Sequence, residues 1–149
     1  MKNNRFKKFT LLILALLLTF SITACLDPAE DGSDVETITV SMNILYPDTL
    51  ADEDGEEQEV EAENIRDFKM QVENSATILQ ILQSFADQEG ITLQVSDSGE
   101  TVYVTSINDI AEGKSSGWIY EVNGEASLED CSNYVPKNGD EITWEYIKF

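Results

Sequence analysis

The stretch GWIYEVNG, residues 117–124, places Trp118, Tyr120 and Val122 on one face of an extended strand, because successive side chains of a strand point to opposite faces. The Asn123-Gly124 dipeptide then predicts a tight turn that ends the strand. The last segment, residues 141–149, repeats the pattern and places Ile142, Trp144 and Tyr146 together. These two segments predict neighbouring strands of a small sheet.

Outward from this pair, further segments have the composition or alternation of strands: residues 38–46, 65–72, 91–95 and 101–107. Residues 76–89 instead have helical periodicity, with these apolar residues on one face: Ile78, Leu79, Ile81, Leu82, Phe85 and Ala86. Ser75 or Thr77 is placed to cap the start of the helix, and Gly90 to end it. One helix among five or six short strands predicts an α+β fold, with the helix packed on one face of a mostly antiparallel sheet.

The first 25 residues have the pattern of an export signal. Four basic residues precede an apolar run over residues 9–22, which is shorter than the roughly 20 residues that a membrane-spanning helix needs. The run leads into ITAC, residues 22–25, which resembles the lipobox of bacterial lipoproteins. The resemblance implies that residues 1–24 are a cleaved lipoprotein signal peptide and that the Cys25 thiol carries a diacylglycerol. An uncleaved anchor and a plain secreted protein are the alternatives.

Two parts are expected to follow this signal. Residues 25–36 are acidic and contain almost no apolar side chains, so they bury too little surface to order themselves and are predicted to be a tether. Residues 37–149 are long enough for one domain with a single hydrophobic core. We therefore expect an extracytoplasmic domain that is held close to the cell membrane by its lipid anchor.

The chain is strongly acidic after the signal. All 29 acidic residues but only five of the nine basic residues follow Cys25, which gives this part a formal charge of −24. Such a charge repels phosphate backbones and anionic headgroups, so nucleic acid binding and a basic membrane contact are not expected. Acyl chains outweigh this repulsion, since each buried CH₂ contributes about 0.8 kcal/mol.

Catalytic chemistry has little support in the composition. The chain contains no histidine to activate a serine or cysteine nucleophile. Cys131 lies beside Glu129 and Asp130, whose charges raise the pKa of a thiol. If Cys25 carries a lipid, Cys131 has no disulfide partner within the chain and is either a small buried hydrophobic residue or an exposed thiol. A solvated acidic surface accounts for the many carboxylates, so we expect no catalytic residues and no enzyme.

The acidic segment 48–64 is the candidate for a metal site. With Gly55 at position 6 of an EF-hand loop, Asp52, Asp54 and Glu61 fall at ligand positions, but position 1 is Leu50 and no flanking helices are predicted. We therefore expect a solubilising loop and no dedicated metal site. A weak cation site, occupied in a calcium-rich exterior, is the alternative.

The second candidate site is aromatic. The small residues at 115–117 predict a flexible loop that leads directly into Trp118 and Tyr120. Trp and Tyr combine a large apolar area with a polar group, which suits a flat ligand or an interface. The alternative is that the two rings point inward and form the core of the sheet.

The C-terminal half also resembles a known family. Residues 117–124, Asn133-Tyr134 and residues 137–146 carry a two-part pattern, and residues 77–82 and 103–108 match it as well. They are similar to the bacterial domain family that resembles the C-terminal domain of transcobalamin and intrinsic factor. The resemblance covers roughly residues 37–149. It implies a β-grasp-like domain, cobalamin as a candidate ligand, and Ser116, Trp118 and Tyr120 on the ligand side.

The sequence is compatible with two functions. The first is a lipid-anchored, extracytoplasmic binding module for a small ligand or a surface partner, with contacts around residues 115–118 and 125–134. The second is a structural or adhesive surface module that binds a protein or a cell-wall polymer and has no small-molecule pocket.

Overall fold

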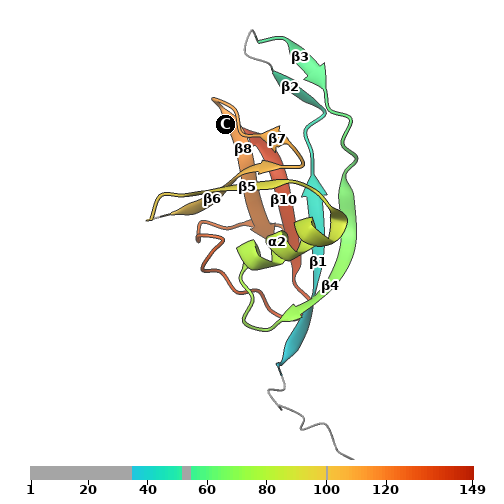
Figure 1. The fold of residues 1–149 in the computed structure, drawn as a ribbon, viewed down its shortest axis with the longest axis vertical. Coiled ribbons are helices and arrows are strands. Elements are labelled where there is room, and N and C mark those ends of the chain that lie inside the picture. Colours follow the sequence, from blue (N-terminus) through green and yellow to red (C-terminus); the bar gives the residue numbers. More distant parts are fainter. Residues whose placement is uncertain (1–34, 52–54, 100) are drawn as a thin grey trace, which may run out of the picture. The chain divides into compact units, whose positions relative to one another are not determined.

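The computed structural model describes residues 35–51, 55–99 and 101–149, which form a five-stranded sheet, one helix and two smaller sheets (Figure 1). In chain order the elements are β1 (Thr37–Leu45), β2 (Thr49–Ala51), β3 (Glu57–Glu59), β4 (Ile65–Glu73), α2 (Ile78–Glu89), β5 (Leu93–Asp97), β6 (Val102–Ile107), β7 (Ile110–Ala111), β8 (Ser116–Val122), β9 (Glu125–Ala126) and β10 (Glu141–Lys148). Cys25 and the predicted signal peptide lie outside the described residues. No helix within the described ranges is both long and apolar enough to span a bilayer.

The main sheet has the strand order β4-β1-β10-β8-β9. Its central strands β1 and β10 run parallel, and every other neighbouring pair in it is antiparallel. The predicted β-grasp-like α+β fold is confirmed. The strand alternation did not indicate that the central pair is parallel, because pairing direction depends on residues far apart in sequence.

The hydrophobic core lies on one face of the main sheet. In β1 the residues Val40, Met42 and Ile44 are buried at every second position. The predicted grouping of these residues on one face of β8 and one face of β10 is confirmed, and both faces point into the core. Their residues lie opposite one another as Trp118↔Tyr146, Tyr120↔Trp144 and Val122↔Ile142. Directly opposed side chains pack closely in an antiparallel pair, so this register produces a continuous apolar layer.

Helix α2 packs its apolar face into this core. Ile78, Ile81, Leu82, Phe85 and Ala86 are its buried residues. Thr77 is the N-cap and forms a capping box with Gln80, in which each side chain accepts a hydrogen bond from the other residue's backbone N–H. Gly90 ends the helix in the left-handed conformation, at φ 69°. Of the two residues predicted to cap the start of the helix, Ser75 and Thr77, the N-cap is Thr77.

A second sheet, with the order β5-β6-β7, supplies the remaining core residues. Val104 and Ile107 of β6 are buried in the shared core, whereas Tyr103 is 44% exposed. Val104 and Tyr103 agree with the predicted alternation over residues 101–107, whereas the buried Ile107 departs from it, since strict alternation would place Ile107 on the face of Tyr103. Strand β5 begins at Leu93, two residues later than predicted, and Ile91 forms a backbone hydrogen bond to the end of the helix instead.

The acidic segment 48–64 differs from the prediction. Instead of a loop it contains the antiparallel hairpin β2–β3, with Thr49 opposite Glu59 and Ala51 opposite Glu57. The physical reason is that Leu50, Val60 and Ala62 pack against the core and fix the hairpin despite the surrounding charge. Residues 52–54, which include two of the carboxylates aligned with an EF-hand loop, lie outside the described residues. The short strands β7 and β9 were also not predicted, since two residues are too few to show a period.

We expect Thr77→Ala to lower the free energy of unfolding by about 1 kcal/mol, because the capping box then loses the side-chain acceptor for the Gln80 N–H. Ser75→Ala is the matched control and should change stability by less than about 0.5 kcal/mol. Urea unfolding followed by circular dichroism measures both variants. Equal losses for the two variants would contradict the assignment of Thr77 as the cap.

Candidate functional site

The described residues contain a cleft between the β2–β3 hairpin and the turn that joins β6 to β7. It has a volume of about 630 Å³, within the range of roughly 300–1,000 Å³ that is usual for small-molecule sites. Its lining residues are Leu50, Ala51, Gln58, Glu59, Val60, Glu61, Ala62, Asn108 and Ile110. We call this the hairpin cleft.

The cleft combines apolar surface with a few polar groups. Leu50, Val60 and Ile110 are half-buried, pack against the core and supply aliphatic contact area. Glu59 and Glu61 contribute acidic groups, and none of the lining residues is basic. A ligand that suits this lining is partly apolar and either neutral or cationic.

The backbone of the β6–β7 turn is fixed by its conformation and by hydrogen bonds. Asn108 and Asp109 adopt φ values of 53° and 64°, in the left-handed region that Asn and Asp tolerate better than most residues. The Thr92 hydroxyl donates to the Asp109 carboxylate at 2.7 Å and accepts from the Asp109 N–H at 2.9 Å. This side of the cleft is therefore held in place before any ligand arrives.

Trp118 supports the same wall from inside the core. Its indole N–H donates to the Ile110 carbonyl oxygen at 2.8 Å. The ring packs edge-on against Tyr46 and Tyr146, with centroid separations of 5.8 and 5.4 Å. Tyr46 in turn lines a smaller hollow of about 250 Å³ that shares Glu59, Val60 and Ala62 with the hairpin cleft. Trp118, Tyr46 and Tyr146 thus connect the main sheet to the walls of both hollows.

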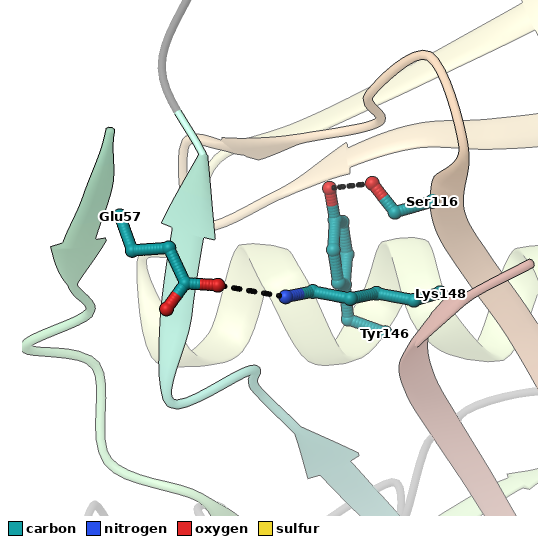
Figure 2. Close-up of polar contacts among 4 residues, drawn as sticks. All are labelled: Glu57, Ser116, Tyr146 and Lys148. Carbon is teal, nitrogen blue, oxygen red and sulfur yellow. Dashed lines mark hydrogen bonds and ion pairs between the residues drawn. The ribbon is translucent and has the colours of Figure 1, made fainter. Parts of the chain in front are cut away.

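Ser116 belongs to a hydrogen-bond chain at the start of β8 (Figure 2). The Tyr146 hydroxyl donates to the Ala111 carbonyl oxygen at 3.0 Å. Because this hydroxyl has one proton, the Ser116 hydroxyl must be the donor in its 2.9 Å contact with Tyr146. A methyl group on Gly113 would lie 2.7 Å from the Ser116 oxygen. The β7–β8 turn is therefore closely fitted rather than freely flexible.

One ion pair joins the hairpin to the last strand. The Lys148 ammonium lies 3.4 Å from a Glu57 carboxylate oxygen (Figure 2), and the two side chains are 64% and 61% exposed. An ion pair this exposed contributes roughly 0–1 kcal/mol. It orients the hairpin weakly, and the apolar contacts of Leu50 and Val60 hold it more strongly.

The three residues predicted to bind a ligand have different surroundings. Trp118 and Tyr120 are 7% and 6% exposed and lie in the core, whereas Ser116 is half-buried. The Tyr120 hydroxyl hydrogen-bonds the Glu129 carbonyl oxygen at 2.6 Å and the Ser127 hydroxyl at 2.8 Å, and so fixes the 125–134 loop. Burial raises the pKa of Tyr120, against the opposing effect of Ser127, so its hydroxyl stays protonated at neutral pH. Direct ligand contact by these residues stays a prediction.

Of the two alternatives for Cys131, a small buried residue or an exposed thiol, the structure shows the buried residue. It is 3% exposed, and its thiol donates weakly to the Val102 carbonyl oxygen at 3.6 Å. Burial, with a smaller effect of the Asp130 charge, raises the pKa of the thiol to about 11. The neighbouring Asp130 carboxylate accepts from the N–H groups of Val102 and Ser132 at 2.6 and 2.8 Å. These hydrogen bonds fix the start of β6 against residues 130–132.

Sequence reasoning missed the residues that line the hairpin cleft. The available signals were weak: Leu50, Val60 and Ala62 are isolated apolar residues in an acidic segment, and Asn108-Asp109 is a turn dipeptide between apolar residues. Over the described ranges, no three His, Cys, Asp or Glu side chains are grouped so as to hold a metal ion.

Residues 75–148 match the family model described as Domain of unknown function (DUF4430). The DUF4430 match runs from just before the Thr77 cap to the end of β10, so it includes Asn108 and Ile110 but not the β2–β3 hairpin. No curated protein sequence matches the chain.

The fold is similar to that of solved structures. The crystal structure of haptocorrin in complex with Cbi matches with a TM-score of 0.62 and 15% identity, over 77% of this chain and 26% of the haptocorrin chain. This chain therefore spans about a quarter of haptocorrin, and the likeness establishes the fold. A Ruminococcus gnavus ATCC 29149 protein to which metal binding is attributed matches with a TM-score of 0.43 and 14% identity, over 76% of this chain and 98% of that one. This second likeness is too low to support an inference.

The Cys131 thiol should react slowly in the folded chain. With a pKa of about 11 instead of the ordinary 9.0, its thiolate fraction near pH 8 is about 100-fold lower than in the unfolded chain, before any steric shielding. Iodoacetamide labelling of a Cys25→Ser variant, with and without denaturing urea, measures the ratio of rates. The raised pKa of the Cys131 thiol also makes the free energy of unfolding depend on pH. The contribution of the protonated thiol to this free energy is complete below about pH 9 and is lost as the pH rises toward 11. Equal labelling rates in the two states would contradict the assignment.

Proposed function

We propose that this chain is a lipid-anchored, extracytoplasmic binding module without catalytic activity, and that it binds a small ligand in the hairpin cleft. The observation that carries the proposal is the cleft itself: a cavity of about 630 Å³ with aliphatic walls, acidic groups and a rigid turn on one side. Small-molecule sites commonly combine such an apolar lining with a few fixed polar groups.

The proposed ligand class follows from the lining. Two glutamates and no basic residue line the cleft, so an anionic ligand would be repelled and a neutral or cationic one favoured. Cobalamin is the named candidate, supported by the likeness of the fold to haptocorrin in complex with Cbi. Trp118 would then act by holding Ile110 in the cleft wall, whereas Ser116 and Tyr120 fix the β7–β8 turn and the 125–134 loop, which lie outside the cleft lining.

The proposed absence of catalysis rests on the chemistry of the side chains. The sequence has no histidine. The Cys131 thiol is protonated at neutral pH and buried. Burial also raises the pKa of Tyr46, against the smaller effect of a hydrogen bond with Asn108, so this phenol beside the smaller hollow is a poor base. The Cys131 thiol and the Tyr46 phenol are therefore unsuited to proton or acyl transfer.

The second candidate function is a structural or adhesive surface module. It is favoured by Leu128, which is fully exposed at the loop that Tyr120 fixes through Ser127 and Glu129. An apolar side chain presented on a rigid loop is suited to insertion into a pocket of a partner protein. In this case the hairpin cleft would have no ligand of its own.

Titration with cyanocobalamin distinguishes the two functions. A ligand bound in the hairpin cleft should change the tryptophan fluorescence, because Trp118, one of the two tryptophans, is hydrogen-bonded to Ile110 in the cleft wall. The signal is corrected for light absorbed by the ligand. Ala62→Leu fills the cleft and should weaken binding about tenfold. Ala111→Leu makes the same change at an exposed position outside the lining and should leave binding unchanged. No response at high micromolar cyanocobalamin would favour the structural module.

The proposed anchor has an independent test. Cys25→Ala removes the thiol that would carry the diacylglycerol, so the variant should move from the membrane fraction to the soluble extracytoplasmic fraction. Immunoblotting of fractionated cells measures the distribution, and Cys131→Ala, which leaves Cys25 intact, should remain with the membranes. A Cys25→Ala variant that still sediments with membranes would refute lipidation as the means of attachment.

A further inference from the structure

A second groove lies between strand β4 and helix α2, and it shares no lining residue with the hairpin cleft. Figure 1 shows β4, in green, as the outermost strand of the main sheet, with α2 beside it. The groove has a volume of about 670 Å³. Met70, Val72 and Ile81 provide buried or half-buried apolar surface, and the exposed side chains of Gln83, Asp87 and Gln88 extend along its helical side.

Strand β4 has a free edge along this groove. Within the described residues it pairs with β1 alone, so every second residue directs its N–H and C=O groups away from the sheet. A bulge interrupts the strand at Arg66 and Asp67, where two residues lie opposite Asn43 alone and Asp67 has a φ of 55°. The regular part, residues 68–73, remains available for pairing beside the groove.

We infer that this groove binds an extended, cationic peptide segment of a partner protein, which adds to β4 as a further strand. An edge strand beside a helix-walled groove offers both elements of such recognition: backbone hydrogen bonds on one side and contacts for alternate side chains on the other. Apolar side chains of the added strand would pack on Met70, Val72 and Ile81. The spacing of two residues between side chains on one face of a strand matches that of Met70 and Val72.

The negative charge of the groove favours a cationic partner segment. The groove lining contains Glu73 and Asp87 and no basic residue, and Lys69 of the pairing segment 68–73 lies outside that lining. The part of the chain after Cys25 has a formal charge of −24. Lys or Arg residues at the ends of the bound segment would complement both carboxylates. The same charge disfavours a second copy of this chain as the occupant, because two strongly acidic domains repel each other. This inference does not depend on the proposed small-molecule function.

The probe for this site is the peptide acetyl-KKVTVTVKK-amide, whose paired end lysines present one cation to each face of an added strand. Fluorescence anisotropy of a labelled copy measures its affinity for the purified chain. Asp87→Lys should weaken binding about tenfold or more by placing like charges together. Glu89→Lys makes the same change in charge on the same helix outside the groove lining and should weaken it less than twofold. Both substitutions place a cation near the helix C-terminus, where it is tolerated.

Two control peptides test the mode of binding. Replacement of the four lysines by glutamates should abolish binding. Replacement of the central valine by proline should weaken binding about tenfold, because proline removes a backbone donor. Hydrogen exchange should show new protection at residues 68–73 when the lysine peptide binds. Three results would overturn the inference: equal effects of the two charge variants, binding without protection of β4, or a peptide-independent dimer that protects β4.

Discussion

The parallel pairing of β1 with β10 joins the first and last strands of the domain, and the other elements are built around it. Asn43 and Thr143, 100 positions apart, lie opposite each other and are linked by a 3.0 Å side-chain hydrogen bond. Closing so long a segment costs chain entropy, which is offset because Met42, Ile44, Ile142 and Trp144 become fully or almost fully buried on the other face. Strand β4 then pairs with the free side of β1, and β8 with the free side of β10.

The same pairing explains where the cleft forms. The hairpin β2–β3 connects the end of β1 to the beginning of β4, and Lys148 at the end of β10 reaches Glu57 in that hairpin (Figure 2). The β6–β7 turn reaches the same region because the Trp118 N–H holds the Ile110 carbonyl. Connections at the ends of a rigid sheet are free to vary in sequence while the sheet fixes their position, which suits them to ligand binding.

The aromatic residues act in two ways at once. Their rings form most of the apolar layer between β8 and β10, and their polar atoms hold the turns: Trp118 holds Ile110, Tyr120 holds Glu129, and Tyr146 holds Ala111. A buried polar atom without a partner is costly, so these hydrogen bonds also satisfy the rings. Trp144 differs from these three aromatic residues, since its buried indole N–H has no partner within the described residues, and its ring lies 5.5 Å from that of Tyr120.

The sequence by itself determined the local elements. Alternation placed β1, β6, β8 and β10, and the Thr77 cap with Gly90 bounded the helix, because these signals lie within a few residues of one another. The tertiary structure alone decided the parallel central pair, the position of β4 at the edge of the sheet that the described residues form, and the cleft that Leu50, Val60 and Ile110 form. Each of these depends on contacts between segments far apart in the chain. Likewise, an exposed Trp118 and a buried one have the same sequence pattern, and only packing against Tyr46, Tyr146 and Ile110 distinguished them.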